Sequence, residues 1–192
     1  NVPMAQFPKG TEAGTILHTI LENSDFASEN NSETIRAILK KKMNFKSQEE
    51  LETMTATVND CINSLCSVPI FEGGKSLRDV GKDEKISEME FFITIKNDMQ
   101  KGELSQIISD NYKTEELEGD NVRKGFLQGF IDLVVKVDGK YYIIDWKSNY
   151  LGESFSDYDE KHLREEMKKH NYYLQFMLYL TAFDRYMTTL DP

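Results

Sequence analysis

The amino-acid sequence predicts an α/β fold in which helices flank a small central sheet. Apolar residues recur at helical spacing near both ends of the chain, and runs rich in β-branched and aromatic residues lie between them. The expected order is helix, helical segment, strand, helix, strand hairpin and long helix, which is typical of layered α/β or α+β proteins. The 192 residues suit one domain with a sizeable core.

The first third of the chain is expected to be helical. Residues 11–22 carry apolar side chains on one helical face, and residues 30–67 continue with a helical but more polar pattern. Ser47 and Glu50 have the spacing of a capping box, which indicates that a helix begins there. Pro69 ends this pattern.

Residues 71–87 are rich in Gly, Lys and Asp, and we expect them to form an exposed loop. Together, the helical pattern over 30–67 and this loop predict an insert over residues 27–87 after the first helix, most of it helical. The Gly-Gly-Lys-Ser stretch at 73–76 resembles part of a phosphate-binding loop, but the full pattern needs a glycine where Pro69 stands. We expect no ATP site in this chain.

The second half is predicted to contain the sheet and a closing helix. A strand is expected over residues 88–95, a short helix over 99–110, and a long helix over about 160–189. A strand hairpin is expected over 125–148, with strands at 125–137 and 140–147. The side chains expected on or near the buried side of the long helix are Leu163, Met167, Leu174, Met177, Leu178 and Phe183. Tyr172, Tyr173 and Phe176 are expected to be core residues, with base-stacking platforms as the alternative.

The composition excludes several classes of function. The net charge of −10 gives no general attraction to phosphates, so any nucleic acid must be delivered to the domain. Cys61 and Cys66 are too few for a four-cysteine iron–sulfur cluster, and we expect them to be reduced thiols in a cytosol. No apolar run approaches the roughly 18 residues of a membrane span, so no membrane partner is expected.

The hairpin over 125–148 raises a question, because each of its strands carries an aspartate among apolar residues. Asp138-Gly139 predicts a two-residue type I′ turn, which fixes the register of the two strands. Counting outward from the turn, Val137 faces Lys140, and Asp132 then faces Asp145. Directly opposed Cβ atoms are about 4.5–5.5 Å apart, so the two carboxylates should lie side by side.

Lys147 falls on the same sheet face as Asp145, because side chains alternate along a strand. Like charges directly opposite each other destabilise a sheet unless a proton or a cation compensates them. Two interpretations are open: a divalent ion with oxygen ligands, for which Mg²⁺ is suitable, or a fortuitous Asp/Asp/Lys cluster at a sheet edge.

Four motifs, taken together, give the sequence a family resemblance. They are Gly14-Thr-Ile-Leu-His18, Gly129-Phe-Ile-Asp132, Asp145-Trp-Lys-Ser148 and Gln175-Phe-Met-Leu-Tyr179. In sequence and in order they resemble the GxxxH, Gx[IV]D, DxK[ST] and QxxxY motifs of RecB-type nucleases in the PD-(D/E)xK superfamily. This resemblance implies a restriction-endonuclease-like core, with a central mixed sheet flanked by helices.

The resemblance also implies roles for individual residues. Asp132, Asp145 and His18 are expected to be metal ligands, and the backbone carbonyl of Trp146 is expected to be a further one. Lys147 is expected to position or deprotonate the attacking water, or to stabilise the developing negative charge.

Further residues are expected around this centre. Gln175 and Tyr179 share a helix face and are expected to orient the DNA backbone or Lys147. Glu90 is expected as an additional acidic contributor near the metal. The residues Lys168, Lys169 and His170 form the best basic patch for DNA, with a merely solvated helix face as the alternative.

The implied activity is Mg²⁺-dependent hydrolysis of DNA phosphodiesters, with Mn²⁺ as a substitute metal. The implied enzyme is of the exodeoxyribonuclease V type, a bacterial cytoplasmic machine for double-strand-break repair by recombination and for degradation of foreign linear DNA. Expected partners are single- and double-stranded DNA, the rest of the RecB-type subunit, RecC and RecD, and also RecA. The chain lacks an initiator methionine and ends without a terminating feature, so we expect a fragment of a larger helicase–nuclease subunit.

Two other functions compete with the nuclease. One is a catalytically silent nuclease-fold module that binds DNA or protein, which the presence of His18, Asp132, Asp145 and Lys147 disfavours. The other is a stand-alone relative acting in CRISPR adaptation or mobile elements, which the missing cysteines disfavour.

Overall fold

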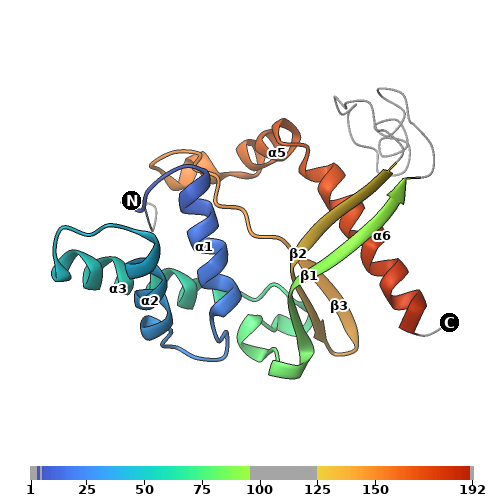
Figure 1. Ribbon diagram of the computed structural model, residues 1–192, viewed down its shortest axis with the longest axis horizontal. Helices are drawn as coiled ribbons and strands as arrows, with labels where there is room; N and C mark the ends of the chain where they lie inside the picture. Colours follow the sequence, from blue (N-terminus) through green and yellow to red (C-terminus); the bar gives the residue numbers. More distant parts are fainter. Residues whose placement is uncertain (1–3, 5, 96–124, 191–192) are drawn as a thin grey trace. The chain divides into compact units, whose positions relative to one another are not determined.

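The computed structural model describes residue 4 and residues 6–95 and 125–190 (Figure 1). The helices and strands, in chain order, are α1 (Thr11–Asn23), α2 (Ser32–Lys42), α3 (Gln48–Ser67), β1 (Lys85–Ile95), β2 (Gly125–Val137), β3 (Lys140–Ile144), α5 (Glu160–Lys169) and α6 (Tyr172–Leu190). The predicted mixture of helices and sheet is confirmed. The helix expected over 99–110 lies outside the described residues.

The chain divides into two compact units. The first comprises Asn1–Met89 and Asp132–Asp157, and the second comprises Glu90–Ile131 and Tyr158–Pro192. Strands β1 and β2 each contribute one part to each unit. Within the described ranges, no helix is long and apolar enough to cross a membrane.

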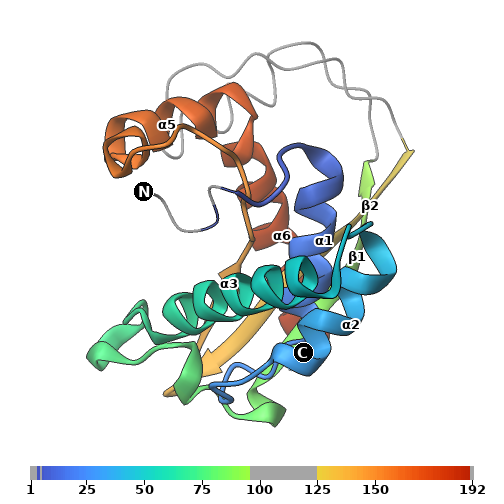
Figure 2. The same ribbon diagram turned by 90° about the vertical axis from the view of Figure 1, so that its left-hand side faces the viewer.

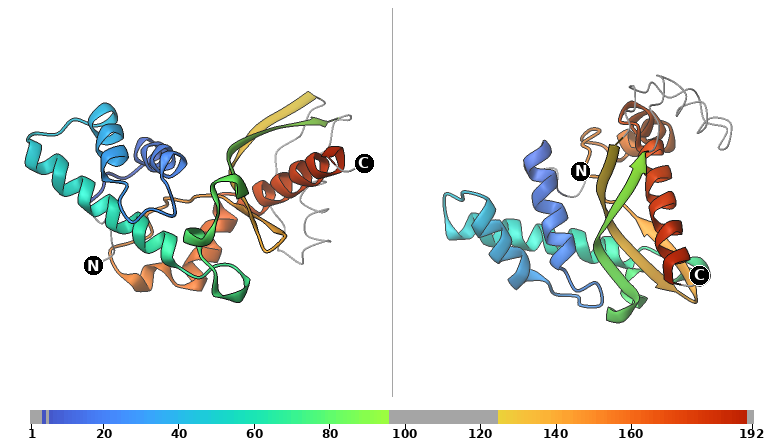
Figure 3. Two further views of the ribbon diagram at one scale, coloured as in Figure 1. Left: turned by 90° about the horizontal axis from the view of Figure 1, so that it is seen from below. Right: turned by 45° about the vertical axis from the view of Figure 1, so that its right-hand side comes forward.

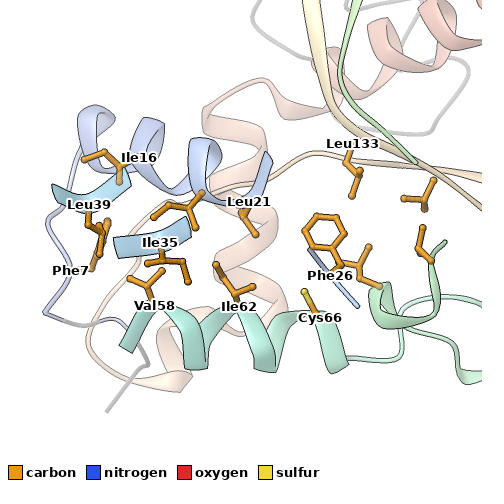
Figure 4. Close-up of a cluster of buried hydrophobic side chains, with 14 of the residues drawn as sticks. Phe7, Ile16, Leu21, Phe26, Ile35, Leu39, Val58, Ile62, Cys66 and Leu133 are labelled. Carbon is orange, nitrogen blue, oxygen red and sulfur yellow. The ribbon is translucent and has the colours of Figure 1, made fainter. Parts of the chain in front are cut away.

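Helices α1, α2 and α3 build the core of the first unit. α2 packs against both α1 and α3 (Figure 2). Their apolar side chains converge with Leu133 of β2 in one cluster (Figure 4). Within this cluster, the residues with 0% exposed surface are Ile20, Ile35, Leu39 and Val58. This cluster holds α1 and β2 in one body, and both elements carry predicted site residues.

The helix predicted from Ser47 and Glu50 is α3. The Ser47 hydroxyl accepts a hydrogen bond from the Glu50 amide at 3.1 Å, which satisfies a backbone donor at the helix start. The Glu50 carboxylate accepts from the amide of Lys46 at 2.7 Å, so the returning bond comes from the residue before the cap.

Residues 71–87 do not form the expected exposed loop. They contain three short 3₁₀ turns and the start of β1 at Lys85. The apolar residues Phe71, Leu77 and Val80 are buried in the core of the first unit, which holds these turns in place. The abundance of Gly, Lys and Asp concealed these apolar anchors.

The sheet has the order β1-β2-β3, with β2 and β3 antiparallel (Figure 3). The predicted register is confirmed, because Val137 pairs with Lys140 and the ladder continues to Leu133 with Ile144. Asp138 has φ 50° and Gly139 has φ 80°, as a type I′ turn requires.

The expectation that the second strand of the hairpin reaches residue 147 is wrong, because β3 ends at Ile144. The backbone amide of Trp146 donates to the carboxylate of Asp132 at 2.7 Å. A side-chain acceptor thus takes the place of a strand carbonyl, and the chain leaves the ladder immediately before Asp145.

The single long helix expected at the end of the chain is also wrong. The chain breaks between α5 and α6 at Asn171, which has φ 54°. α5 buries no residue, and Leu163 and Met167 are 46% and 36% exposed. Phe176 of α6 is likewise exposed, so it is not a core residue.

The buried residues of α6 are Tyr179 and Ala182, and the other predicted side chains of this helix are partly buried. Within the second unit, the rings of Tyr179 and Phe91 meet edge to face at 5.8 Å. A Cβ on Gly129 would lie 2.5 Å from the Phe91 ring, so only glycine leaves room for this contact.

Both cysteines are free thiols. Burial raises the pKa of the Cys61 and Cys66 thiols, which favours their protonated form.

Candidate active site

Asp132 is the central residue of the candidate site, which lies in the first unit. Its side chain is 11% exposed, and its Oδ2 accepts a hydrogen bond from the backbone amide of Trp146 at 2.7 Å. Leu133, its neighbour in β2, is buried in the helical core, so the strand beneath Asp132 is firmly held. The carboxylate therefore has a fixed position, although a charged group costs free energy when it is removed from water.

His18 approaches Asp132 from α1. Its Nδ1 lies 3.5 Å from Asp132 Oδ2, and its side chain is 32% exposed. The helix is anchored by Ile16 and Ile20, which flank His18 in sequence and are buried. The imidazole is therefore brought to the carboxylate by core packing and keeps partial access to solvent.

The pKa of His18 is raised above its ordinary value of 6.5. The hydrogen bond with Asp132 is the largest cause, and the negative charges of Asp132 and Asp145 add to it. Burial and the positive charge of Lys147 act in the opposite direction. His18 thus experiences both aspartates and the lysine, which places all four predicted residues in one electrostatic environment.

Lys147 forms an ion pair with Oδ2 of Asp145. The Asp145 side chain is 19% exposed and that of Lys147 is 31% exposed. Both groups lie in the irregular segment after β3, so their pairing does not depend on strand alternation. The predicted proximity of Lys147 and Asp145 is confirmed.

Sequence reasoning missed Glu88 as a member of this environment. Glu88 is half-buried and has φ 50°, an uncommon conformation within a strand. Burial raises the pKa of its carboxyl group, and the charges of Asp132 and Glu22 raise it further. Glu88 and Glu90 are two residues apart and so fall on the same strand face, which gave no reason to choose between them.

Glu90, the acidic residue chosen from the sequence, is exposed and belongs to the second unit. Its carboxylate accepts a hydrogen bond from Gln128 at 2.6 Å. Its contribution near a metal stays a prediction.

Gln175 and Tyr179 share one face of α6, as predicted. The Gln175 amide donates to the Tyr179 hydroxyl at 2.6 Å, and Tyr179 is buried. Both belong to the second unit, and their action on DNA or Lys147 stays a prediction.

The basic patch at the end of α5 is partly neutralised. Glu166 forms ion pairs with Lys169 at 3.3 Å and with His170 at 2.8 Å. The ring of His170 also stacks on Tyr172, with centroids 5.5 Å apart. DNA binding by Lys168, Lys169 and His170 stays a prediction.

The donor chemistry of the site suits a divalent cation. The two aspartates supply hard oxygen ligands, His18 supplies an imidazole nitrogen, and Glu88 adds negative charge nearby. In the described ranges, however, no group of three or more His, Cys, Asp or Glu side chains is arranged to hold a metal ion. His18 and Lys147 instead pair with one aspartate each, which compensates the two buried charges.

The family is shown by comparison with known proteins. The sequence pattern of the PD-(D/E)XK nuclease superfamily matches residues 3–191. The chain therefore belongs to the PD-(D/E)XK nuclease superfamily.

Within that superfamily, the chain is similar to one particular protein from several bacteria. It is 35% identical over 186 residues to the RecBCD enzyme subunit RecB of Escherichia coli K12, which covers 95% of the chain and 15% of that RecB. It is 30% identical over 188 residues to RecB of Haemophilus influenzae, covering 96% of the chain and 15% of the relative. For RecB of Buchnera aphidicola subsp. Schizaphis graminum the identity is 34% over 184 residues, covering 94% and 15%. The chain thus spans about 15% of the length of these relatives.

The hydrogen bond between His18 and Asp132 predicts how the stability of the metal-free protein depends on pH. Because the folded pKa of His18 is raised, its contribution to stability is fully present below pH 6.5 and is lost as the pH rises through the folded pKa. Asp132→Asn removes the main cause while keeping an acceptor for Trp146, so the pKa of His18 should fall.

NMR titration with a chelator present measures this pKa, because the chain has only three histidines and His18→Gln identifies the signal. Asp159→Asn is the matched control, since Asp159 pairs with His162 at 2.7 Å. An unchanged His18 pKa in Asp132→Asn contradicts the assignment.

Proposed function

We propose that the chain is a metal-dependent deoxyribonuclease domain that hydrolyses DNA phosphodiesters within a RecBCD-type helicase–nuclease. The observation that carries this proposal is the gathering of His18, Asp132, Asp145 and Lys147 at the end of one hairpin. Membership in a nuclease superfamily supports it. The proposed biological roles are double-strand-break repair by recombination and degradation of foreign linear DNA.

The proposed cofactor is Mg²⁺, with Mn²⁺ as a substitute. Its ligands would be His18, Asp132, Asp145 and the backbone carbonyl of Trp146. When bound, the ion supplies positive charge that stabilises the transition state and lowers the pKa of a coordinated water. Asp132 is suited to fixed ligation, because the Trp146 amide and the core beneath β2 orient it.

Lys147 is the proposed group for the attacking water. Its partial exposure leaves the ammonium accessible from solvent, and its partner Asp145 holds it beside the other site residues. A lysine in that position donates hydrogen bonds to the water or to the oxygen that gains negative charge. Gln175 and Tyr179 are proposed to orient the DNA backbone or Lys147, and Glu90 is a proposed additional acidic contributor.

The proposed partners are single- and double-stranded DNA, the remainder of a RecB-like subunit, RecC and RecD, with RecA as a further partner. The proposed location is the bacterial cytoplasm. Delivery of DNA by the motor subunits gives an account of the net charge of −10, because the domain then needs little attraction of its own.

One observation favours a second candidate, a catalytically silent module that binds DNA or protein. His18 and Lys147 already compensate the two aspartates, and the described residues hold no assembled group of three metal ligands. Such a pairing compensates the carboxylates without a cofactor. Activity measurements on site variants separate the two candidates.

Single-stranded DNA and Mg²⁺ should give cleavage that is lost in Asp145→Ala and with a chelator. Lys147→Ala should reduce the rate about 10²- to 10⁴-fold, as expected when a positioned proton-transfer group is removed. The exposed Lys136 of β2 provides the matched control Lys136→Ala. The full-length protein with its partner subunits is assayed beside the chain.

Cleavage that persists in both Asp145→Ala and chelator contradicts the proposed site. Absence of cleavage by every wild-type form supports the silent module.

The acidic charge predicts weak DNA binding by the chain, with a shallow dependence on salt. Few phosphate contacts release few counterions, so the slope of log affinity against log salt should be small. Fluorescence anisotropy with a labelled oligonucleotide at several salt concentrations measures this slope. Tight binding with a steep slope contradicts delivery by the motor subunits.

A further inference from the structure

We propose that Gly14 and Ser148 are positioning residues whose close contact holds Lys147 in place relative to His18. The proposal rests on the nuclease function proposed above. Gly14 lies one helical turn before His18 in α1, and Ser148 follows Lys147 directly. One contact between them therefore links the two segments that carry these site residues.

A Cβ atom at position 14 fits only if the Ser148 hydroxyl moves away. A Cβ atom on Gly14 would lie 2.8 Å from the Ser148 hydroxyl oxygen, a distance that real Cβ atoms essentially never show. Gly14 has no positive φ, so its backbone conformation does not require glycine. Glycine in a helix interior is also less favourable than alanine. Glycine at this position leaves the Ser148 hydroxyl where it is.

Independent contacts hold the same segment on both sides. The Lys9 ammonium lies 3.5 Å from the centre of the Tyr150 ring, which links the segment to the residues just before α1. The Trp146 amide is bound to Asp132 in β2, and the Trp146 ring meets Phe26 edge to face at 6.3 Å. The segment from Trp146 to Tyr150 is thus held between α1 and β2, with Lys147 inside it.

This arrangement predicts a separation of stability from activity. Gly14→Ala improves the helix propensity of α1 but displaces Ser148, so the melting temperature should hold or rise while kcat falls. A displacement of about 1 Å at a catalytic group can cost up to about 100-fold in rate. We expect a loss of at least about tenfold in kcat, with little change in KM for DNA.

A double-mutant cycle in the full-length protein tests the contact. The variants are Gly14→Ala, Ser148→Ala and their combination, because Ser148→Ala removes the oxygen that a new Cβ would meet. The matched control is Thr15→Ala, which improves the same helix at an exposed position. Ser148→Val crowds the same contact from the side of residue 148. It is used in place of Gly14→Ala if the Gly14→Ala protein does not fold.

Non-additive effects on kcat, with recovery in the combined variant, are the expected result. Additive effects, or wild-type kcat in Gly14→Ala, overturn the proposal.

Hydrogen exchange in the presence of a chelator provides a readout that needs neither metal nor cleavage. Amides of residues 146–150 should exchange faster in Gly14→Ala and return toward wild-type rates in the combined variant. Equal exchange in all forms overturns the contact as a positioning device. An inactive wild type with the expected exchange pattern rejects the nuclease function while the contact stands.

Discussion

The turn at Asp138 and Gly139 is the constraint on which the rest of the site depends. Positive φ at both residues sets the register of β2 and β3, and the last pair of the ladder is Leu133 with Ile144. Asp132 directly precedes Leu133 in β2, and Asp145 directly follows the end of β3. A register shifted by one residue would move Asp132 to the opposite face of the sheet. The same shift would turn the apolar side chains of β2, including Leu133, away from the core. The hydrophobic core of the first unit, which includes Leu133, Val135 and Val137, therefore also fixes the Asp132 carboxylate.

Charge compensation then shapes the site. Asp132 and Asp145 are mostly buried; Asp132 pairs with His18, and Asp145 pairs with Lys147. These pairs reduce the free-energy cost of burying the two carboxylates. The pKa of His18 is raised, first by its hydrogen bond with Asp132 and then by the negative charges of both aspartates. Within the described residues, the two carboxylates are thus compensated by side chains of the protein itself.

Local signals made part of the structure predictable from sequence. The Asp-Gly turn gave the register, and the motifs pointed to His18, Asp132, Asp145 and Lys147, which the structure brings together. What could not be predicted depends on tertiary contacts. β3 ends early because the Trp146 amide binds a side chain rather than a strand carbonyl, and Glu88 differs from Glu90 through its positive φ. The apolar spacing continues through Asn171, so it gave no sign of the break between α5 and α6.

The central claim is that His18, Asp132 and Asp145 jointly hold a divalent ion beside Lys147. Binding of Mn²⁺ without DNA, followed by electron paramagnetic resonance, measures this directly in wild type, Asp132→Asn and Asp145→Asn. The account predicts one site in wild type, weakened at least about tenfold in each variant, since each loses an anionic oxygen ligand. Equal Mn²⁺ affinity in all three proteins, or no binding in wild type, contradicts it.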